Sequence, residues 1–302
     1  MLNSSRLILR GRRQDVIFNI IGILFTLVGI VTLAVLVIDL MIDGLPRLSY
    51  QFMTSFPSRR PENAGILSAW VGTLMVISVT LATAVPIGVA AAVYLEEYAP
   101  KNWVTTLIEI NISNLAGVPS IIYGLMALGL LVYQFRLGRS VLVGGLTLAL
   151  LVLPIVIVAT REAIRAIPGN IREAAYAAGA TKWQVIRFHL IPYSMGGIAT
   201  GTIIAMSRAI GETAPLITIG ALSYVAYLPP PPVQTTAPFV NTEWLHSGFT
   251  VLPIQMFNWV SRPQAKFHEN AAATGLVLIV FTLAINGVAM YLRYRIRKNL
   301  KW

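Results

Sequence analysis

The stretch Ser140–Thr160, SVLVGGLTLALLVLPIVIVAT, contains 21 residues without a single charged side chain. It is followed at once by a polar stretch, REAIRAIPGNIREAAYAAGATKWQVIRFHLIP, which covers residues Arg161 to Pro192. An α-helix needs roughly 20 apolar residues to cross the ~30 Å hydrocarbon layer of a bilayer. The first stretch therefore predicts a transmembrane helix, and the second predicts a loop that lies in water beside the membrane.

Five other segments are long and apolar enough to cross a membrane. Only 12% of the 302 residues are charged, against about 25% in a typical soluble domain. The short alternating strands of a membrane β-barrel are absent from the sequence pattern. We therefore expect an all-α polytopic membrane protein, with six transmembrane helices in one domain that covers residues 1–302. The five other segments are Val16–Ile38, Gly65–Leu95, Ile110–Phe135, Ile191–Leu228 and Ala271–Leu292.

The net charge of +11 follows the membrane topology and does not indicate a nucleic-acid site. With both termini in the cytoplasm, the inner segments hold 15 Lys and Arg residues and the outer loops hold 7. This asymmetry is the positive-inside rule for six helices. We therefore expect a multi-pass protein of the plasma (inner) membrane that contacts lipid and binds no nucleic acid. The first apolar run is too long for the core of a secretory signal, so we expect a retained anchor.

The two longer outer loops have different compositions. The loop Ile42–Ala64 contains three prolines and is expected to be irregular. The extracytoplasmic loop, residues 229–270, opens with Pro229–Pro232, a run that favours a stiff polyproline spacer. A linker at the rim is a more common use of such a run than a docking ligand. Its aromatic residues are expected to rest on the membrane interface: Trp244, Phe249, Phe257, Trp259 and Phe267.

Two of the apolar segments contain helix breakers at membrane depth. Pro119 follows Gly117 in one, and Gly211 and Pro215 follow Arg208 in the other. Irregular backbone inside a membrane is tolerated only where protein or a wet cavity covers it. These breaks therefore predict a central pathway nearby, although a plain packing kink is an equal alternative for Pro119.

The polar stretch after the fourth segment has a helical pattern. Asn170 is expected to cap a helix that begins at Ile171, with Glu173 near the positive end of its dipole. Gly179 is expected to end this helix, and Thr181 to cap a second one. The pattern predicts a short helix, a glycine turn and a second helix on the cytoplasmic face. An ordinary amphipathic connector is the alternative interpretation.

The same residues resemble the EAA loop of ABC importer permeases. Glu173-Ala174-Ala175, three residues, Gly179 and a final Leu190-Ile191-Pro192 follow the spacing of that motif, and His189 and Ile191 depart from its usual residues. The resemblance covers the chain from about Gly65 onward and implies the type I permease fold. It also implies that the loop, residues 161–192, inserts into a separate ATP-binding subunit. The implied coupling residues are Glu173, Ala174, Ala175, Gly179 and Ala180.

The chain is expected not to be an enzyme. It contains no G-x-x-x-x-G-K-[ST] phosphate-binding loop, so ATP and its magnesium ion are expected to bind a partner subunit. The sequence contains no cysteine, which excludes disulfides and thiolate metal sites. The pair His268-Glu269 begins a zinc-protease-like motif, but alanine stands where the second ligand belongs, at Ala272. We therefore expect no cofactor and no metal site in this chain.

Arg208 and Glu212 are the ionisable residues that lie deep in an apolar segment. Each costs roughly 2.5–3.5 kcal/mol at that depth, so each is expected to face a partner or a cavity. Four residues apart on a helix, they can pair with each other. One interpretation is a structural ion pair that locks two helices.

The other interpretation of this pair is an anion site. The guanidinium offers a planar fork of donors for a tetrahedral oxyanion. The carboxylate can accept a hydrogen bond from the proton that phosphate carries and sulfate lacks, and this bond would favour phosphate. A third interpretation is an ion-coupled transporter or channel in which Glu212 carries a proton.

The sequence around these charges resembles the permeases of phosphate (Pst) importers. The length of the chain and the run Thr213-Ala214-Pro215 resemble the PstA-type subunit more than its PstC-type partner. The matching runs are SRAIGETAPL from Ser207 and GVPSIIYG from Gly117. The resemblance implies a phosphate route at Arg208 and Glu212. Ser120 and Tyr123 are candidates for further hydroxyl contacts. The resemblance also implies four kinds of partner: a PstC-type permease, two ATP-binding subunits, an extracytoplasmic phosphate-binding protein and inorganic phosphate.

Overall fold

The computed structural model describes residues 2–221, 224–234 and 239–299. Over these residues it is helical, apart from turns and one isolated β-bridge between Val233 and Val240. Five helices are long and apolar enough to cross a membrane, and a sixth span is formed by two shorter helices that meet at 105°. The expected all-α fold with six spans is therefore confirmed. The spans are α1 (Leu2–Gly44), α3 (Leu67–Val93), α4 (Trp103–Leu115) with α5 (Ser120–Ala127), α6 (Val141–Arg165), α9 (Ile191–Gly211) and α13 (Ala265–Asn299).

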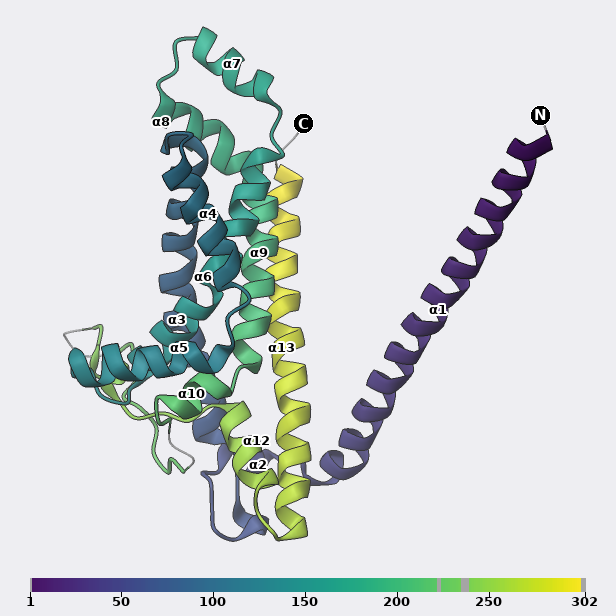
Figure 1. Cartoon of the computed structure of the whole chain (residues 1–302). Helices are drawn as coiled ribbons and strands as arrows, with labels where there is room; N and C mark the ends of the chain where they lie inside the picture. Colours follow the sequence, from purple (N-terminus) through teal and green to yellow (C-terminus); the bar gives the residue numbers. More distant parts are fainter. Residues whose placement is uncertain (1, 222–223, 235–238, 300–302) are drawn as a thin grey trace.

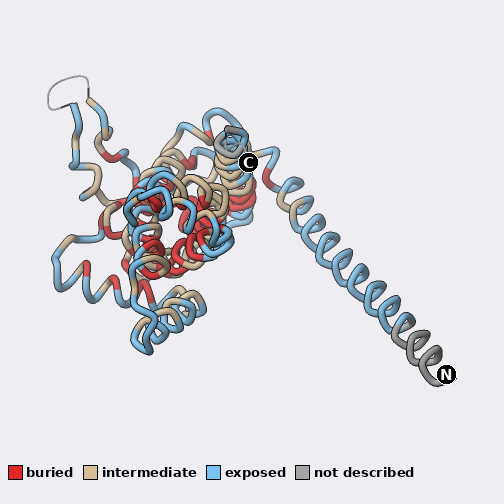
Figure 2. Tube along the Cα trace, turned by 90° about the horizontal axis from the view of Figure 1, so that it is seen from above, coloured by how far each residue is buried: buried red, intermediate tan, exposed pale blue. Residues whose placement is uncertain are grey.

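The core of the molecule is a bundle in which α6 lies between α3 and α9. Two thirds of the apolar part of α6 is buried, because this helix is apolar on every side and meets a neighbour on most of them. Figure 2 shows the buried residues gathered along the bundle. The last span, α13, packs beside α9. The largest cluster of buried side chains includes Val76, Leu148, Leu151, Val156, Ala205 and Ile210.

The first helix, α1, stands away from the bundle along most of its length (Figure 1). Its apolar side chains are exposed, and Phe18 is an example. Contact with the bundle occurs at its C-terminal end, where Gly44 lies against the backbone of α13 at Ala272 and Ala273. A Cβ atom on Gly44 would lie 2.8 Å from the carbonyl carbon of Ala272, so this contact requires glycine.

The outer loops are more ordered than expected, because they pack on each other. The loop between α1 and α3 contains η1 (Leu45–Arg47), α2 (Tyr50–Thr54) and η2 (Pro61–Asn63). The guanidinium of Arg47 donates to Asn270 Oδ1 at 2.6 Å and to carbonyl oxygens of Pro61, Glu62 and Ala64. The expectation of an irregular loop was therefore wrong over these short helices.

Three of the five aromatic residues expected at the membrane interface are buried instead, whereas Trp244 is half-buried and Phe257 is 56% exposed. Phe249, Trp259 and Phe267 are at most 2% exposed, so they do not rest on the membrane interface. Trp259, on α12 (Leu252–Val260), packs between Phe52 and Phe267, with ring centroids 6.0 and 6.4 Å away. These rings fill a small core that joins the two outer loops. These three rings are therefore buried against protein instead of lying at the membrane interface.

The inner end of the molecule carries the polar loop. It contains α7 (Gly169–Ala177), α8 (Lys182–Val185) and the π-helical segment η5 (Ile186–Leu190), which runs directly into α9. Two other π-helical segments, η3 (Tyr94–Tyr98) and η4 (Leu128–Gln134), extend α3 and α5. Figure 1 shows α7 and α8 at the same end as the start of α1 and the end of α13.

Candidate functional site

The third span is broken and not simply kinked. Helix α4 ends at Leu115 and α5 begins at Ser120, with a bend of 105° between them. The Tyr123 hydroxyl donates to the Leu115 carbonyl oxygen at 2.8 Å, and the Val118 N–H donates to the same oxygen at 3.1 Å, so both bonds hold the chain across the break. Pro119 stands at the start of α5, where its missing N–H costs nothing. The structure therefore rejects the packing-kink alternative for Pro119.

A second break follows Arg208 and lies against the first. Helix α9 ends at Gly211, Glu212 has extended backbone (ψ 128°), and α10 (Ala214–Thr218) then begins. A Cβ atom on Gly124 of α5 would lie 2.7 Å from the Cα and the carbonyl oxygen of Pro215. The two irregular segments therefore pack against each other, as expected for broken backbone in apolar spans that is covered by protein.

Arg208 and Glu212 form the predicted ion pair at this meeting point. Arg208 Nε lies 3.3 Å from Glu212 Oε1, and the side chains are 34% and 19% exposed. The Tyr123 hydroxyl is near enough to interact electrostatically with Arg208. Among the described residues, Arg208 has no second polar partner, so both terminal guanidinium nitrogens remain available as donors. The pair is therefore partly open and is not sealed in the core.

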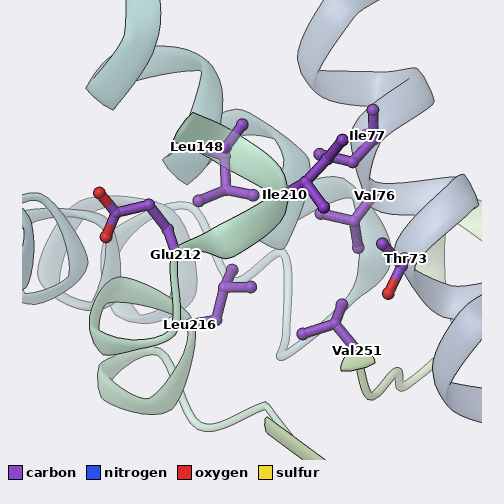
Figure 3. A pocket seen from close by; sticks show the side chains of 9 residues that line it. Thr73, Val76, Ile77, Leu148, Ile210, Glu212, Leu216 and Val251 are labelled. Atoms are coloured by element: carbon purple, nitrogen blue, oxygen red, sulfur yellow. The ribbon is translucent and has the colours of Figure 1, made fainter. Parts of the chain in front are cut away.

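The small cavity beside the pair does not serve as an anion site. Its volume is about 10 Å³, enough for one water molecule. Apolar side chains line most of it, and the Glu212 carboxylate points away from them (Figure 3). Thr73, its one hydroxyl, already donates to the Ala69 carbonyl and accepts from the Leu252 N–H. An anion would therefore have to approach the pair from its exposed side.

Ser120 and Tyr123 differ in what they offer an anion. The Tyr123 side chain is 5% exposed and its hydroxyl proton is used by Leu115. Ser120 is half-buried in the first turn of α5, and within the described chain its hydroxyl has no bonding partner. The structure thus gives Tyr123 a bond across the break and leaves Ser120 as the freer hydroxyl.

The turn of the polar loop has the geometry that its sequence predicts. Gly179 follows α7 with φ of +86°, a left-handed conformation that favours glycine. Thr181 then caps α8: its hydroxyl accepts from the Gln184 N–H, and the Gln184 side chain accepts from the Thr181 N–H. This reciprocal pair fixes the start of the second helix.

The start of the first helix was placed wrongly. Helix α7 begins at Gly169 with Pro168 at the N-cap, so Asn170 is a helical residue and not the cap. The Ile171 N–H already donates to the Pro168 carbonyl, because the buried Ile167 fixes the point at which the chain turns. Glu173 therefore lies beyond the first turn and is not placed to interact with the dipole there.

The expected coupling residues divide between two faces of the loop. Glu173, Ala174 and Gly179 are exposed, whereas Ala175 and Ala180 are half-buried against an apolar cluster at the inner end of the bundle. That cluster contains Ile164, Val185 and Ile186. The loop thus exposes small side chains to solvent while two of its alanines pack against the bundle.

Ion pairs at the inner end were not anticipated. Arg165 Nε lies 2.8 Å from Glu96 Oε2, and Arg161 pairs with Glu96 and with Glu109. Arg172 pairs with Glu97 at 3.1 Å. The available signal was the pair Glu96-Glu97, two adjacent acidic residues placed directly after an uncharged run of 31 residues.

The histidines do not form a site. His189 is half-buried, and His246 and His268 are exposed. In the described ranges, no group of three His, Cys, Asp or Glu side chains is arranged to hold a metal ion.

Comparison with known proteins identifies the family. Residues 84–301 match the family "binding-protein-dependent transport system inner membrane component". The chain is 31% identical to the probable ABC transporter permease protein YqgI of Bacillus subtilis, over 86% of this chain and 88% of that protein. It is 30% identical to the phosphate transport system permease protein PstA of Haemophilus influenzae, over 86% of both.

Two further matches agree with this result. The PstA 1 protein of Mycobacterium tuberculosis is 30% identical over 76% of this chain and 71% of its own length. The fold is similar to an inward-facing structure of the MetNI methionine ABC transporter, with a TM-score of 0.56 at 15% identity, over 74% of this chain and 94% of that chain. The broken helix pair, the inner helix–glycine–helix loop and the family match lead to one conclusion: this chain belongs to the inner membrane components of binding-protein-dependent transport systems, the permease subunits of ABC importers.

Proposed function

We propose that this chain is the PstA-type permease subunit of an ATP-driven importer of inorganic phosphate. The observation that carries the proposal is the Arg208–Glu212 pair, which lies where two broken segments meet and leaves two guanidinium nitrogens unused. A planar fork of donors suits a tetrahedral oxyanion. Several relatives, including those of Haemophilus influenzae and Mycobacterium tuberculosis, are named as phosphate transport permeases.

The pair has two roles in this proposal. In the empty state Glu212 neutralises Arg208, which lowers the cost of a charge at membrane depth. When phosphate arrives, Arg208 donates to its oxygens and Glu212 accepts a hydrogen bond from the P–OH group that phosphate carries near neutral pH. Sulfate has no such proton, so its oxygens would face the carboxylate unpaired.

The chain forms half of the route and requires partners. The exposed side of the pair needs a second surface to enclose an anion, and a PstC-type permease is the partner that we propose for it. Two ATP-binding subunits would receive the exposed face of α7 at Glu173, Ala174 and Gly179, and an extracytoplasmic phosphate-binding protein would deliver the substrate. In this arrangement ATP and magnesium bind the partner, and both termini of this chain are cytoplasmic.

Uptake of [³²P]phosphate into sealed vesicles tests this proposal against an ion-coupled transporter or channel. The complete complex would be loaded with the binding protein on one side and ATP on the other. We expect uptake that needs ATP, persists when an ionophore collapses the ion gradients, and is not competed by excess sulfate. Uptake driven by a proton gradient without ATP would refute the proposal and support proton transfer by Glu212.

A further inference from the structure

The inner end of the bundle contains a second set of charges that the proposed phosphate route does not use. Glu96 and Glu97 are adjacent in the π-helical segment η3, which ends the span that begins with α3. Their side chains nevertheless reach different elements: Glu96 pairs with Arg165 of α6, and Glu97 pairs with Arg172 of α7. This segment therefore joins the bundle to the coupling loop.

Arg172 makes the one of these connections that reaches the coupling loop. Its Nε and Nη2 donate to Glu97 Oε1 at 3.2 and 3.1 Å. Nη1 donates to the Ile167 carbonyl, and Nη2 also donates to the Ile164 carbonyl, each at 3.1 Å. Ile164 stands at the end of α6, and its carbonyl also accepts from the Ile167 N–H. One guanidinium thus holds α7 to both α6 and the end of α3.

Burial makes this connection more than a surface ion pair. The Glu97 side chain is 9% exposed and that of Arg172 is 22% exposed. Removing one partner from such a pair leaves the other charge partly buried and without compensation. The remaining attachment of α7 is apolar, through Ile171 and Ala175. Helix α7 otherwise projects from the bundle (Figure 1). The hydrogen bonds of Arg172 therefore fix the orientation of α7 relative to the bundle.

We propose that Arg172 and Glu97 are positioning residues that transmit movement of the coupling loop to α3 and α6. The loop already continues through α8 and η5 into α9, which carries Arg208. The Arg172–Glu97 contact adds a second connection, so that one displacement of α7 moves the helices on both sides of the core. The inference rests on the proposed coupling role of this loop.

The first test compares Glu97→Gln with Glu162→Gln in the complete complex reconstituted into liposomes. Glu162 is a matched control, because it lies at the same end of the molecule but is exposed and pairs with Arg165 within one helix. Uptake of [³²P]phosphate and hydrolysis of ATP are measured in one sample. We expect Glu97→Gln to lower the phosphate moved per ATP by about fivefold or more, since the Arg172 charge loses its partner. Glu162→Gln should leave this ratio unchanged, and an equal ratio in both variants would overturn the inference.

The second test includes a rescue step, which a merely misfolded variant would not show. The chain has no cysteine, so Glu97→Cys together with Arg172→Cys introduces its only two thiols. The double variant is measured before and after treatment with a short bifunctional methanethiosulfonate, and again after reduction. We expect poor coupling before cross-linking, recovery with the cross-link and loss on reduction. Failure of the cross-link to form, or a formed cross-link without recovery, would contradict the inference.

The same experiment separates the inference from the proposed function. If the unaltered complex hydrolyses ATP but moves no phosphate, the proposed substrate is wrong. The role of the Arg172–Glu97 contact is then judged from the yield of the cross-link and from whether the cross-link restores the stimulation of ATP hydrolysis by the binding protein.

Discussion

Gly201 of α9 and Ala159 of α6 are in such close contact that a Cβ atom on Gly201 would overlap the Cβ atom of Ala159. One turn earlier, Gly197 has the same relation to Ala163. Small residues four apart on each helix let the two backbones approach, which is how helices associate in lipid. This interface connects the helix that carries Arg208 with the helix that leads into the coupling loop. Under the proposed coupling role of the loop, this closely packed contact would carry its movement toward the ion pair.

The first prediction concerns this contact. Replacing Gly201 by Val would force α6 and α9 apart, because nothing flexible can make room for the added atoms. We expect a loss of roughly 1–3 kcal/mol in stability, typical of overpacking, and a complex that melts at lower temperature in detergent. Gly196→Ala is the control, since a Cβ atom there meets open space. Equal melting of the two variants would contradict the close contact.

The second prediction concerns selectivity. Glu212→Gln removes the negative charge that disfavours a fully deprotonated anion and keeps a side chain of the same shape. We expect sulfate to become a competitor of phosphate uptake, with selectivity reduced by about tenfold, or about 1.4 kcal/mol. Competition assays with the complete complex measure this change. Unchanged selectivity would eliminate the proposed role of Glu212.

The third prediction concerns Arg208. Replacing it by Gln removes charge-assisted hydrogen bonds worth about 1.5–3 kcal/mol each. Phosphate uptake should fall by at least tenfold, while ATP hydrolysis by the assembled complex continues. Arg187→Gln serves as a comparison for charge removal outside the route, because Arg187 is an exposed residue of the inner loop. Normal uptake by the Arg208 variant would place the route elsewhere.

The fourth prediction separates a structural hydroxyl from a ligand. Tyr123→Phe removes one bond across the break while the Leu115 carbonyl keeps its bond from the Val118 N–H, so we expect a cost of about 0.5–1.5 kcal/mol in stability. The KM for phosphate should stay the same in the protein that remains folded. Ser120→Ala has no such bond to lose, so its melting temperature should not change. A raised KM for Tyr123→Phe without destabilisation would show that the hydroxyl acts on substrate instead.

The fifth prediction concerns the turn of the coupling loop. Ala in place of Gly179 must adopt φ of +86°, which costs about 1 kcal/mol for a residue with a Cβ atom. There is open space around the position, so the effect comes from the backbone alone. We expect less ATP-binding subunit to co-purify with this variant. Gly169→Ala, also in open space but with ordinary φ, should bind normally.

Local features of the sequence determined much of this protein. The apolar runs placed the spans, because the thickness of the membrane sets their length whatever their neighbours are. Gly179 and Thr181 placed the turn and the second helix, because a left-handed residue and a side-chain cap act within a few residues. The pairing of Arg208 with Glu212 followed from their separation of four residues, although α9 ends at Gly211 and Glu212 itself has extended backbone. The start of α7 was missed by two residues, because burial of Ile167 decided it.

Only the tertiary structure decided which distant residues meet. Gly124 faces Pro215, Arg172 reaches Glu97, and Trp259 is buried against Phe52. The physical reason is that lipid and helix are about equally apolar, so hydropathy does not tell which face of a span meets which neighbour. Small residues, backbone breaks and the few polar side chains make that choice jointly, over separations of tens to hundreds of residues. The sequence therefore identified the loop and the ion pair, and the packing of the helices brought the two broken spans together around that pair.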